Sequence, residues 1–435
     1  MFGFGKKYNA SDGYYWFKNI VDDTEHTNRI TQVLNIKEYL LRKHKVLHKP
    51  DFPHKDEVYV SAKIVLNIIQ SVLNAHISYL SGNPVSFNGN PDVVNKYNNI
   101  YKRGNYNKID YEIVKDMYTF GNAFEYVYLD PKDSRIKSKI IANEDAIPVY
   151  DDEGNYTHFI EHWKDAVTSN EYFIIYYPEK VETYKNDRLV DTKVNLSGLP
   201  IHYSGIIKSA YRNFGEPMCN DLIPIIDAIE NVVSRLDDAV NVYSMNPLGV
   251  VTGKQIKSSI PKETIGTILN LDDGNEFKFA TAEQDYQSIK LELDTLWQQF
   301  YAIACIPSVT FGQSNVANVS ETSLRLLYAR MDDKGKETTM ALRMGLFERY
   351  DAIRKLLAFT GMEFTDEDYD TLDIEFSVNR PIDTFSLMEE LKIQHDMGAI
   401  SIQTIIDKSP YTTDTATEME RITVDKTGAD SETSD

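Results

Sequence analysis

One short segment of the sequence could bind phosphate. GVVTGKQ, residues 249–255, has two glycines and a lysine, as a phosphate-binding loop does. That loop needs four residues between its glycines, and it needs Ser or Thr after the lysine to hold magnesium. Here three residues separate the glycines and Gln255 follows Lys254. The spacing argues against nucleotide binding at this segment.

Two pairs of histidines have spacings that occur in metal sites. HFIEH, residues 158–162, matches an inverted zinc-protease pattern, but that chemistry needs both histidines on one helical face. The segment follows a DDEGN turn and alternates like a strand, which favours ordinary strand histidines. His44 and His48 stand four apart, yet their lysine neighbours disfavour a metal, and a solvated helix is the preferred interpretation. We therefore expect no enzyme activity, no metal and no cofactor.

The elements that carry these residues begin with helices and continue with strands. Residues 14–49 predict two polar helices, and SAKIVLNIIQSVLNAHISYLSGNPV begins a longer helix that Gly82 and Pro84 stop. From about 110 to 210, Tyr, Phe, Val and Ile are frequent, and DDEGN and KNDR have the composition of hairpin turns. This part is predicted to be antiparallel and β-rich.

The second half of the chain is predominantly helical. NDLIPIIDAIENVVSRLDDAVNVYSM and YQSIKLELDTLWQQFYAIACI predict two helices that flank a module of strand-like pieces and turns. The polar stretch FGQSNVANVSETS then separates them from a segment of about forty residues with helical spacing. Gly335 lies midway in that segment, so we expect either a kink or change of buried face there, or a continuous helix that tolerates the glycine.

Charge and composition limit the possible functions. With 46 basic and 66 acidic residues, the net charge is -20, so a chain-wide basic surface that would grip a phosphate backbone is not expected. Two cysteines in apolar helical patterns favour buried, reduced thiols and a cytosolic compartment. The sequence has no signal-peptide core and no run of about eighteen apolar residues, so we expect no membrane association. The polar C-terminal tail is expected to be disordered.

The order of the segments resembles the portal protein of tailed bacteriophages, siphophage type, over residues 60 to about 422. The most specific parts are SYLSGNPV, FGEPMCNDLIPIIDAIENVVSRLDDAVN and IPSVTFGQSNVANVSETSLRLLYARMDDKG. The segment DIEFSVNRPIDTFSLMEELKIQHDMGAISIQTIIDKSPYTTD also looks like the return strand and small crown helices of that family.

The resemblance implies an α+β ring subunit with a β-rich wing, a helical stem, a small α/β clip, a long kinked helix and a helical crown. The implied parts are an N-terminal helical arm (1–60), the first part of the wing (61–217), a stem helix (218–246), the clip (247–280), a second stem helix (281–306), a tunnel loop (307–320), a long wing helix (321–361), a wing return strand (362–381), the crown (382–423) and a disordered tail (424–435).

On this resemblance the polar break lines a channel through which double-stranded DNA passes. The implied loop residues are Gly312, Gln313, Ser314, Asn315, Val316 and Asn318. Their polar members can make weak, neutral hydrogen bonds to phosphates, and none carries a positive charge that would hold moving DNA. The implied stem helices hold nine acidic and two basic residues, which would repel phosphate, although these acids can equally solvate outer helix faces.

Further charged residues are expected at subunit interfaces, the channel or partner contacts. Asp237, Asp238, Arg325, Arg330, Lys334 and Lys336 are the interface or channel candidates, and for the four basic residues we prefer intersubunit salt bridges to phosphate contact. Lys254, Lys257, Lys262, Asp272 and Asp273 are the clip residues expected to dock partners.

The implied partners are about eleven further copies of the chain, the packaging ATPase (terminase large subunit), the scaffold and major capsid proteins, and a head-completion or adaptor protein. The chain would be assembled in the host cytoplasm and become part of the virion at a capsid vertex. Two alternatives stay open from the residues alone. One is a capsid or tail structural protein without DNA contact, and the other is an enzyme whose site comes from scattered residues.

Overall fold

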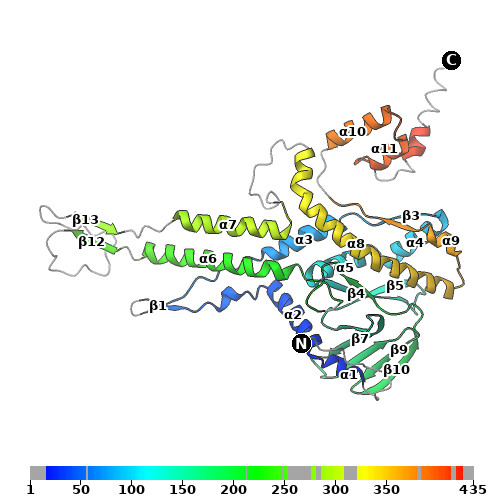
Figure 1. Cartoon of the computed structure of the whole chain (residues 1–435), viewed down its shortest axis with the longest axis horizontal. Coiled ribbons are helices and arrows are strands. Elements are labelled where there is room, and N and C mark those ends of the chain that lie inside the picture. The colour runs from blue at the N-terminus through cyan, green and yellow to red at the C-terminus, as the bar shows by residue number, and fades with distance from the viewer. Residues whose placement is uncertain are drawn as a thin grey trace. The chain divides into compact units, whose positions relative to one another are not determined.

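The computed structural model describes residues 16–54, 57–211, 213–245, 248–252, 276–280, 286–307, 321–379, 384–412 and 418–424 (Figure 1). The fold is α+β, as expected. The chain divides into two compact units, of which the larger comprises Met1–Cys305 with Gly335–Ser377 and the smaller comprises Ile306–Lys334 with Val378–Asp435.

Helices and a hairpin form the N-terminal part of the larger unit. They are α1 (Trp16–Val21), α2 (Thr24–Leu40), the 3-10 turn η1 (Lys45–His48), β1 (Phe52–His54) and β2 (Glu57–Tyr59). Asp23 caps α2 by accepting a hydrogen bond from the amide of Glu25 at 3.1 Å. Trp16 and Phe17 of α1 are buried in one hydrophobic cluster with sheet residues such as Phe173, which fixes the start of the described chain on the sheet.

Two antiparallel sheets form the β-rich region. One has the order β10-β9-β8-β7-β6 and the other β11-β4-β5. Their strands are β4 (Asn122–Leu129), β5 (Ile136–Ile141), β6 (Ala146–Tyr150), β7 (Tyr156–Lys164), β8 (Glu171–Tyr176), β9 (Lys180–Lys185), β10 (Arg188–Val194) and β11 (Ile201–Ser204). Phe124 and Phe159 are fully buried in a second cluster that joins residues of both sheets. HFIEH lies in β7, so the expectation of strand histidines is confirmed.

The predicted start of the β-rich region is wrong. Residues 106–120 form the helix α5 (Tyr106–Phe120), because buried residues recur there at helical spacing, including Tyr106, Ile113 and Met117. This burial outweighs the strand preference of the tyrosines and β-branched residues. Gly121 ends α5 with φ 76°, and a Cβ there would lie 2.2 Å from the carbonyl oxygen of Gly215, so the chain can approach this closely only at glycine.

The apolar helix also begins later than predicted. It is α3 (Ile68–Ser81), followed by Gly82 as expected, whereas residues 60–67 lie outside any helix. Beyond it come β3 (Ser86–Asn88) and α4 (Pro91–Gly104), and β3 pairs with β14 (Asp373–Glu375). α3 packs on α5, and α4 packs on both α5 and β5.

The long helices agree closely with the sequence expectations. They are α6 (Cys219–Met245), α7 (Tyr286–Ala304) and α8 (Glu321–Phe359), with the paired strands β12 (Leu248–Thr252) and β13 (Glu276–Ala280) between the first two. α8 is one uninterrupted helix by hydrogen bonding, and the boundary between the two units falls inside it, between Lys334 and Gly335. The remaining helices are α9 (Asp366–Asp370), α10 (Thr384–Asp396) and α11 (Ile402–Lys408).

Candidate functional site

The helix pair α6 and α7 is the part of the described chain that most closely matches the predicted stem. The two helices pack along one another. Ile229 of α6 and Phe300 of α7 are fully buried, while Val240 is 53% and Leu291 68% exposed. The pair thus has a closed apolar seam and a partly apolar outer surface.

An extended segment lies along α6 and is attached to it by regularly spaced polar contacts. We call residues 41–54 and 57–66 the strap. Three of its backbone amides, two residues apart, donate hydrogen bonds to side chains of α6 that are four residues apart. The pairs are Leu66 to Glu230 at 2.7 Å, Ile64 to Ser234 at 3.1 Å, and Ala62 to Asp238 at 2.7 Å. Because these amides are engaged by α6, residues 62–66 do not join the helix that follows them.

The first part of the strap contacts the same α6 side chains. Nδ1 of His44 lies 2.6 Å from Oε1 of Glu230, and both side chains are fully buried. The ring of Tyr39 stacks on His44 with centroids 3.8 Å apart. Lys49 donates to Asp238 at 2.5 Å. Burial raises the pKa of Glu230 above its ordinary value.

These contacts correct the interpretation of His44. We expected it on a solvated helix, but it precedes η1 and is inaccessible to solvent. The reason is a carboxylate from a helix distant in sequence, which the local pattern of lysines and histidines does not reveal. Among the described residues, no group of three or more His, Cys, Asp or Glu side chains could hold a metal ion.

The same contacts change the roles of the acidic residues predicted for the interface or channel. Asp238 is 7% exposed, and both of its carboxylate oxygens accept hydrogen bonds from the strap. Its position therefore argues against a channel charge, because it is buried and already paired within the subunit. Asp237 is exposed and accepts a hydrogen bond from Asn241 at 3.0 Å, so its predicted role stays a prediction.

A buried cluster of charges anchors α8. Arg349 has no solvent exposure and donates to Asp110 of α5 at 2.5 Å and to Glu125 of β4 at 2.9 Å. It also donates to the hydroxyl of Tyr101 at 2.9 Å, and Tyr203 donates to Glu125 at 2.6 Å. The adjacent carboxylates hold the pKa of Arg349 well above its ordinary value although burial lowers it. The cluster joins α8 to two helices, α4 and α5, and to one sheet through a single side chain.

The sequence did not reveal this anchor. Nothing in the local sequence separates Arg349 from the other basic residues of α8. Of the basic residues singled out there, Arg325 lies 3.9 Å from Glu390 of α10, and both are more than half exposed. Arg330 and Lys336 are exposed and Lys334 is half-buried. Their proposed intersubunit salt bridges stay predictions.

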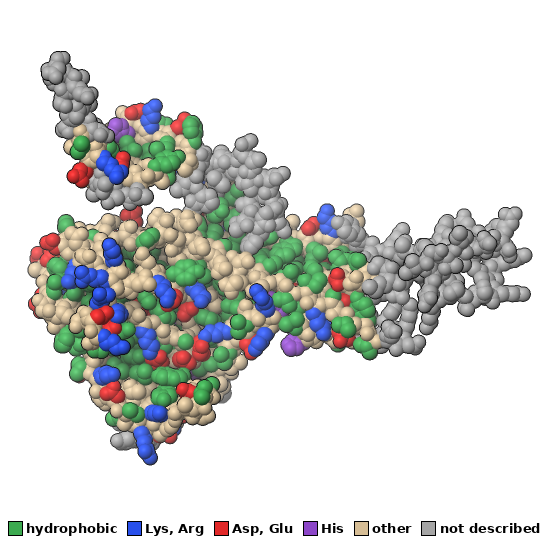
Figure 2. Space-filling model, turned by 180° about the vertical axis from the view of Figure 1, so that it is seen from behind, with side chains coloured by type: hydrophobic (Ala, Val, Ile, Leu, Met, Phe, Trp, Pro, Cys, Tyr) green, Lys and Arg blue, Asp and Glu red, His purple; other side chains and the backbone are tan. Residues whose placement is uncertain are grey.

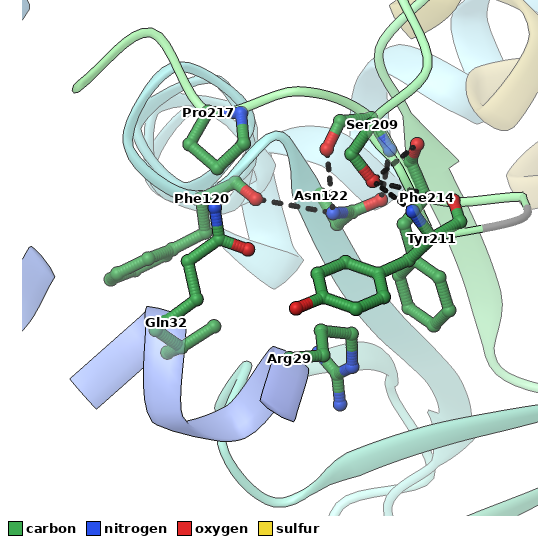
Figure 3. Close-up of a pocket in the computed structure, with 10 residues that line it drawn as sticks. Arg29, Gln32, Phe120, Asn122, Ser209, Tyr211, Phe214 and Pro217 are labelled. Carbon is green, nitrogen blue, oxygen red and sulfur yellow. Dashed lines mark hydrogen bonds between the residues drawn. The ribbon is translucent and has the colours of Figure 1, made fainter. Parts of the chain in front are cut away.

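Arg29 of α2 lines a small pocket beside the end of α5 (Figure 3). It is 4% exposed, donates to the carbonyl oxygens of Asn143 and Ala146, and lies 4.7 Å from the ring centre of Phe214. Figure 3 shows the side chain of Tyr211 next to that of Arg29. The cavity has a volume of only about 10 Å³, roughly the volume that one water molecule requires. The pocket therefore fits a structural contact that holds α2 against the sheet.

The surface of the described residues is mixed in charge. On the face shown in Figure 2, basic side chains are interspersed with acidic and hydrophobic ones. No helix among the described residues is both long and apolar enough to span a bilayer. Cys219 is buried and Cys305 partly exposed, and both are free thiols.

Two groups of predicted site residues lie outside the described residues. They are the loop residues Gly312, Gln313, Ser314, Asn315, Val316 and Asn318, and the clip residues Lys254, Lys257, Lys262, Asp272 and Asp273. Both assignments therefore stay predictions.

Comparison with known proteins identifies one matching family. A family model described as "Phage portal protein, SPP1 Gp6-like" matches residues 21–432. No curated protein matches the chain. Among solved structures, the "Virion of native gene transfer agent (GTA) particle" contains a chain with 10% identity and a TM-score of 0.46, and the alignment covers 77% of this chain and 87% of that one. The "Neck of native GTA particle computed with C12 symmetry" contains one with 10% identity and a TM-score of 0.49, covering 78% and 89%. These structural likenesses are remote, so the family model alone carries the assignment.

Proposed function

Because the chain belongs to the SPP1 Gp6-like family of phage portal proteins, we propose that it forms a ring of about twelve subunits at one vertex of a viral capsid, with an axial channel for DNA. The match to residues 21–432 is the observation that carries this proposal, since it extends over almost the whole chain. The family is structural, not enzymatic. In the assembled particle the subunit belongs to the virion.

The described elements are consistent with such a ring. α6 and α7 supply a stem with exposed apolar side chains such as Leu291, which neighbouring subunits would cover. The buried Arg349 cluster joins the C-terminal part of α8 to α4, α5 and β4 within the larger unit. The loop that precedes α8, residues 307–320, is the proposed channel lining.

The composition of the loop suits passage of DNA without tight binding. Gln313, Asn315 and Asn318 offer neutral hydrogen-bonding groups, and the segment 312–318 has no Lys or Arg. Neutral contacts are individually weak and release no counterions, so they would let a duplex slide. A ring of fixed positive charges would instead retain it.

Energy for packaging would come from a partner. GVVTGKQ departs from the phosphate-loop pattern, so the packaging ATPase, terminase large subunit, is the proposed motor. We propose that the clip, residues 247–280, docks this motor and later a head-completion protein. Scaffold and major capsid proteins would surround the ring during assembly.

The direct test is the assembly state of the purified full chain. Native mass measurement and negative-stain images at micromolar concentration should show closed rings with an axial channel. A preparation that contains only monomers across a range of salt concentrations would contradict the proposal.

A further inference from the structure

The strap has an exposed face that its own subunit does not cover. Leu41 is 72%, Val58 71% and Val60 70% exposed. Arg42 and Lys45 on the same segment are also exposed. The strap therefore offers both apolar area and positive charge to a partner.

The strap is nevertheless fixed in place. Its amides at Ala62, Ile64 and Leu66 are attached to α6, and His44 is buried against Glu230. The exposed face is therefore presented in one conformation, which lowers the ordering cost of binding a partner.

The outer surface of α7 has the complementary character. Leu291 is 68% and Ile303 42% exposed, the exposed carboxylates of Glu292 and Asp294 flank Leu291 on its two sides, and Lys290 next to it is also exposed. Figure 1 shows α7 along one side of α6 and the strap along the other, and both elements contact α6. The strap thus exposes basic and apolar side chains on one side of α6, and α7 exposes carboxylates and apolar side chains on the other.

A closed ring of identical subunits joins two different faces of the subunit, one from each neighbour. We propose that the strap of one subunit docks on α7 of the adjacent subunit, with Arg42 and Lys45 facing Glu292 and Asp294. This inference rests on the proposed ring and gives the N-terminal arm the role of an intersubunit clamp. The partner is a second copy of this chain, because the two faces are complementary in charge and both carry exposed apolar side chains.

Charge reversal tests the contact. The double variants Arg42→Glu with Lys45→Glu, and Glu292→Lys with Asp294→Lys, should each lower the fraction of chains in rings at least about fivefold at a fixed micromolar concentration. The quadruple variant, which exchanges the charges, should recover most of the lost assembly. The matched control is Lys102→Glu with Arg103→Glu, an exposed basic pair on α4, which should assemble as the wild type does.

Two further measurements test whether the strap still lies on α6 in the variants and whether it contacts a neighbouring subunit. Hydrogen exchange at the amides of Ala62, Ile64 and Leu66 should stay slow in each variant, which shows that the strap still lies on α6. Carbodiimide cross-linking of rings made from unlabelled and isotope-labelled chains should join Lys45 to Glu292 or Asp294 of a different copy.

The outcomes separate this inference from the proposed function. If the wild-type chain forms no rings, the proposed function itself is contradicted. If it forms rings and the reversed variants assemble normally, or if the exchanged variant recovers nothing while its strap stays protected, the strap does not dock on α7.

Discussion

Arg349 shows how much a single buried charge can contribute when it is paired with two carboxylates. It faces Asp110 and Glu125 with no solvent access, and burial raises the pKa of Asp110, so this carboxylate depends on the guanidinium to stay ionised. A hydrophobic replacement would leave two carboxylates in the interior without a counterion.

Arg349→Met should therefore lower the free energy of unfolding by about 3–5 kcal/mol. Arg354→Met is the matched control on the same helix, because Arg354 is partly exposed and pairs with the exposed Asp366. Its effect should be much smaller. Urea unfolding of both variants measures this difference. Similar decreases in the free energy of unfolding would show that the buried cluster stabilises the protein no more than the exposed pair does.

The side chain of His202 makes the stability of the folded protein depend on pH. Its Nδ1 lies 2.6 Å from the hydroxyl of Tyr150 and its Nε2 3.0 Å from Oδ1 of Asn122, so a neutral ring can satisfy both contacts. Burial, followed by Lys208 and Arg29, lowers the pKa of His202 to about 3. The unfolded chain takes up this proton near pH 6.5, and the folded chain takes it up only near pH 3.

The stabilisation from neutral His202 is thus present above pH 6.5 and lost as pH falls from 6.5 toward 3. Asp116 and Asp145, whose pKa values burial raises to about 6, act in the opposite direction but are common to wild type and variant. The melting temperature of His202→Gln should therefore decline less than that of the wild type between pH 7 and pH 5. Parallel decline of the two curves would contradict the assignment.

At the scale of elements, the strap and α6 form one unit that depends on few side chains. Asp238 accepts hydrogen bonds from the amide of Ala62 and the ammonium of Lys49, whereas the adjacent Asp237 is exposed and accepts one from Asn241. The two neighbours therefore provide a matched pair for an experiment.

Asp238→Ala should release this end of the strap and accelerate hydrogen exchange at Ala62 by at least tenfold, which corresponds to about 1.4 kcal/mol of lost local protection. Asp237→Ala should leave that exchange rate unchanged. Equal rates in both variants would mean that the strap is held by contacts other than these.

The sequence predicted the long elements but not what joins them. α6, α7 and α8 were predicted within a few residues, because each has apolar residues at helical spacing over many turns. The strap was not predicted, because its hydrogen bonds join backbone amides to side chains 164 to 176 positions away. The pairing of Arg349 with Asp110 and Glu125 was missed for the same reason, since its partners are more than 220 positions away.

At the scale of the whole molecule, the proposed channel makes a prediction about charge. Replacing Gln313, Asn315 and Asn318 with lysine would add about thirty-six positive charges to a ring of twelve and should stall DNA in a salt-dependent way. The triple alanine variant should assemble normally, since exposed polar loop residues contribute little to stability. A packaging assay on proheads with verified rings tests both, and normal DNA uptake by the lysine variant would show that this loop does not line the channel.

The two rows of atoms that meet between strap and α6 have slightly different periods. Two residues of extended chain advance about 6.6–6.8 Å, and four residues of helix advance about 6.0 Å. The strap amides and the α6 acceptors can therefore stay aligned over only a short length. Over the three pairs seen here, the difference between the two spacings already adds up to more than about 1 Å. The mismatch itself therefore limits how far an extended chain can follow α6, and it selects one alignment: deleting a single residue between Ala62 and Leu66 would move an amide out of reach of its acceptor at one end or the other.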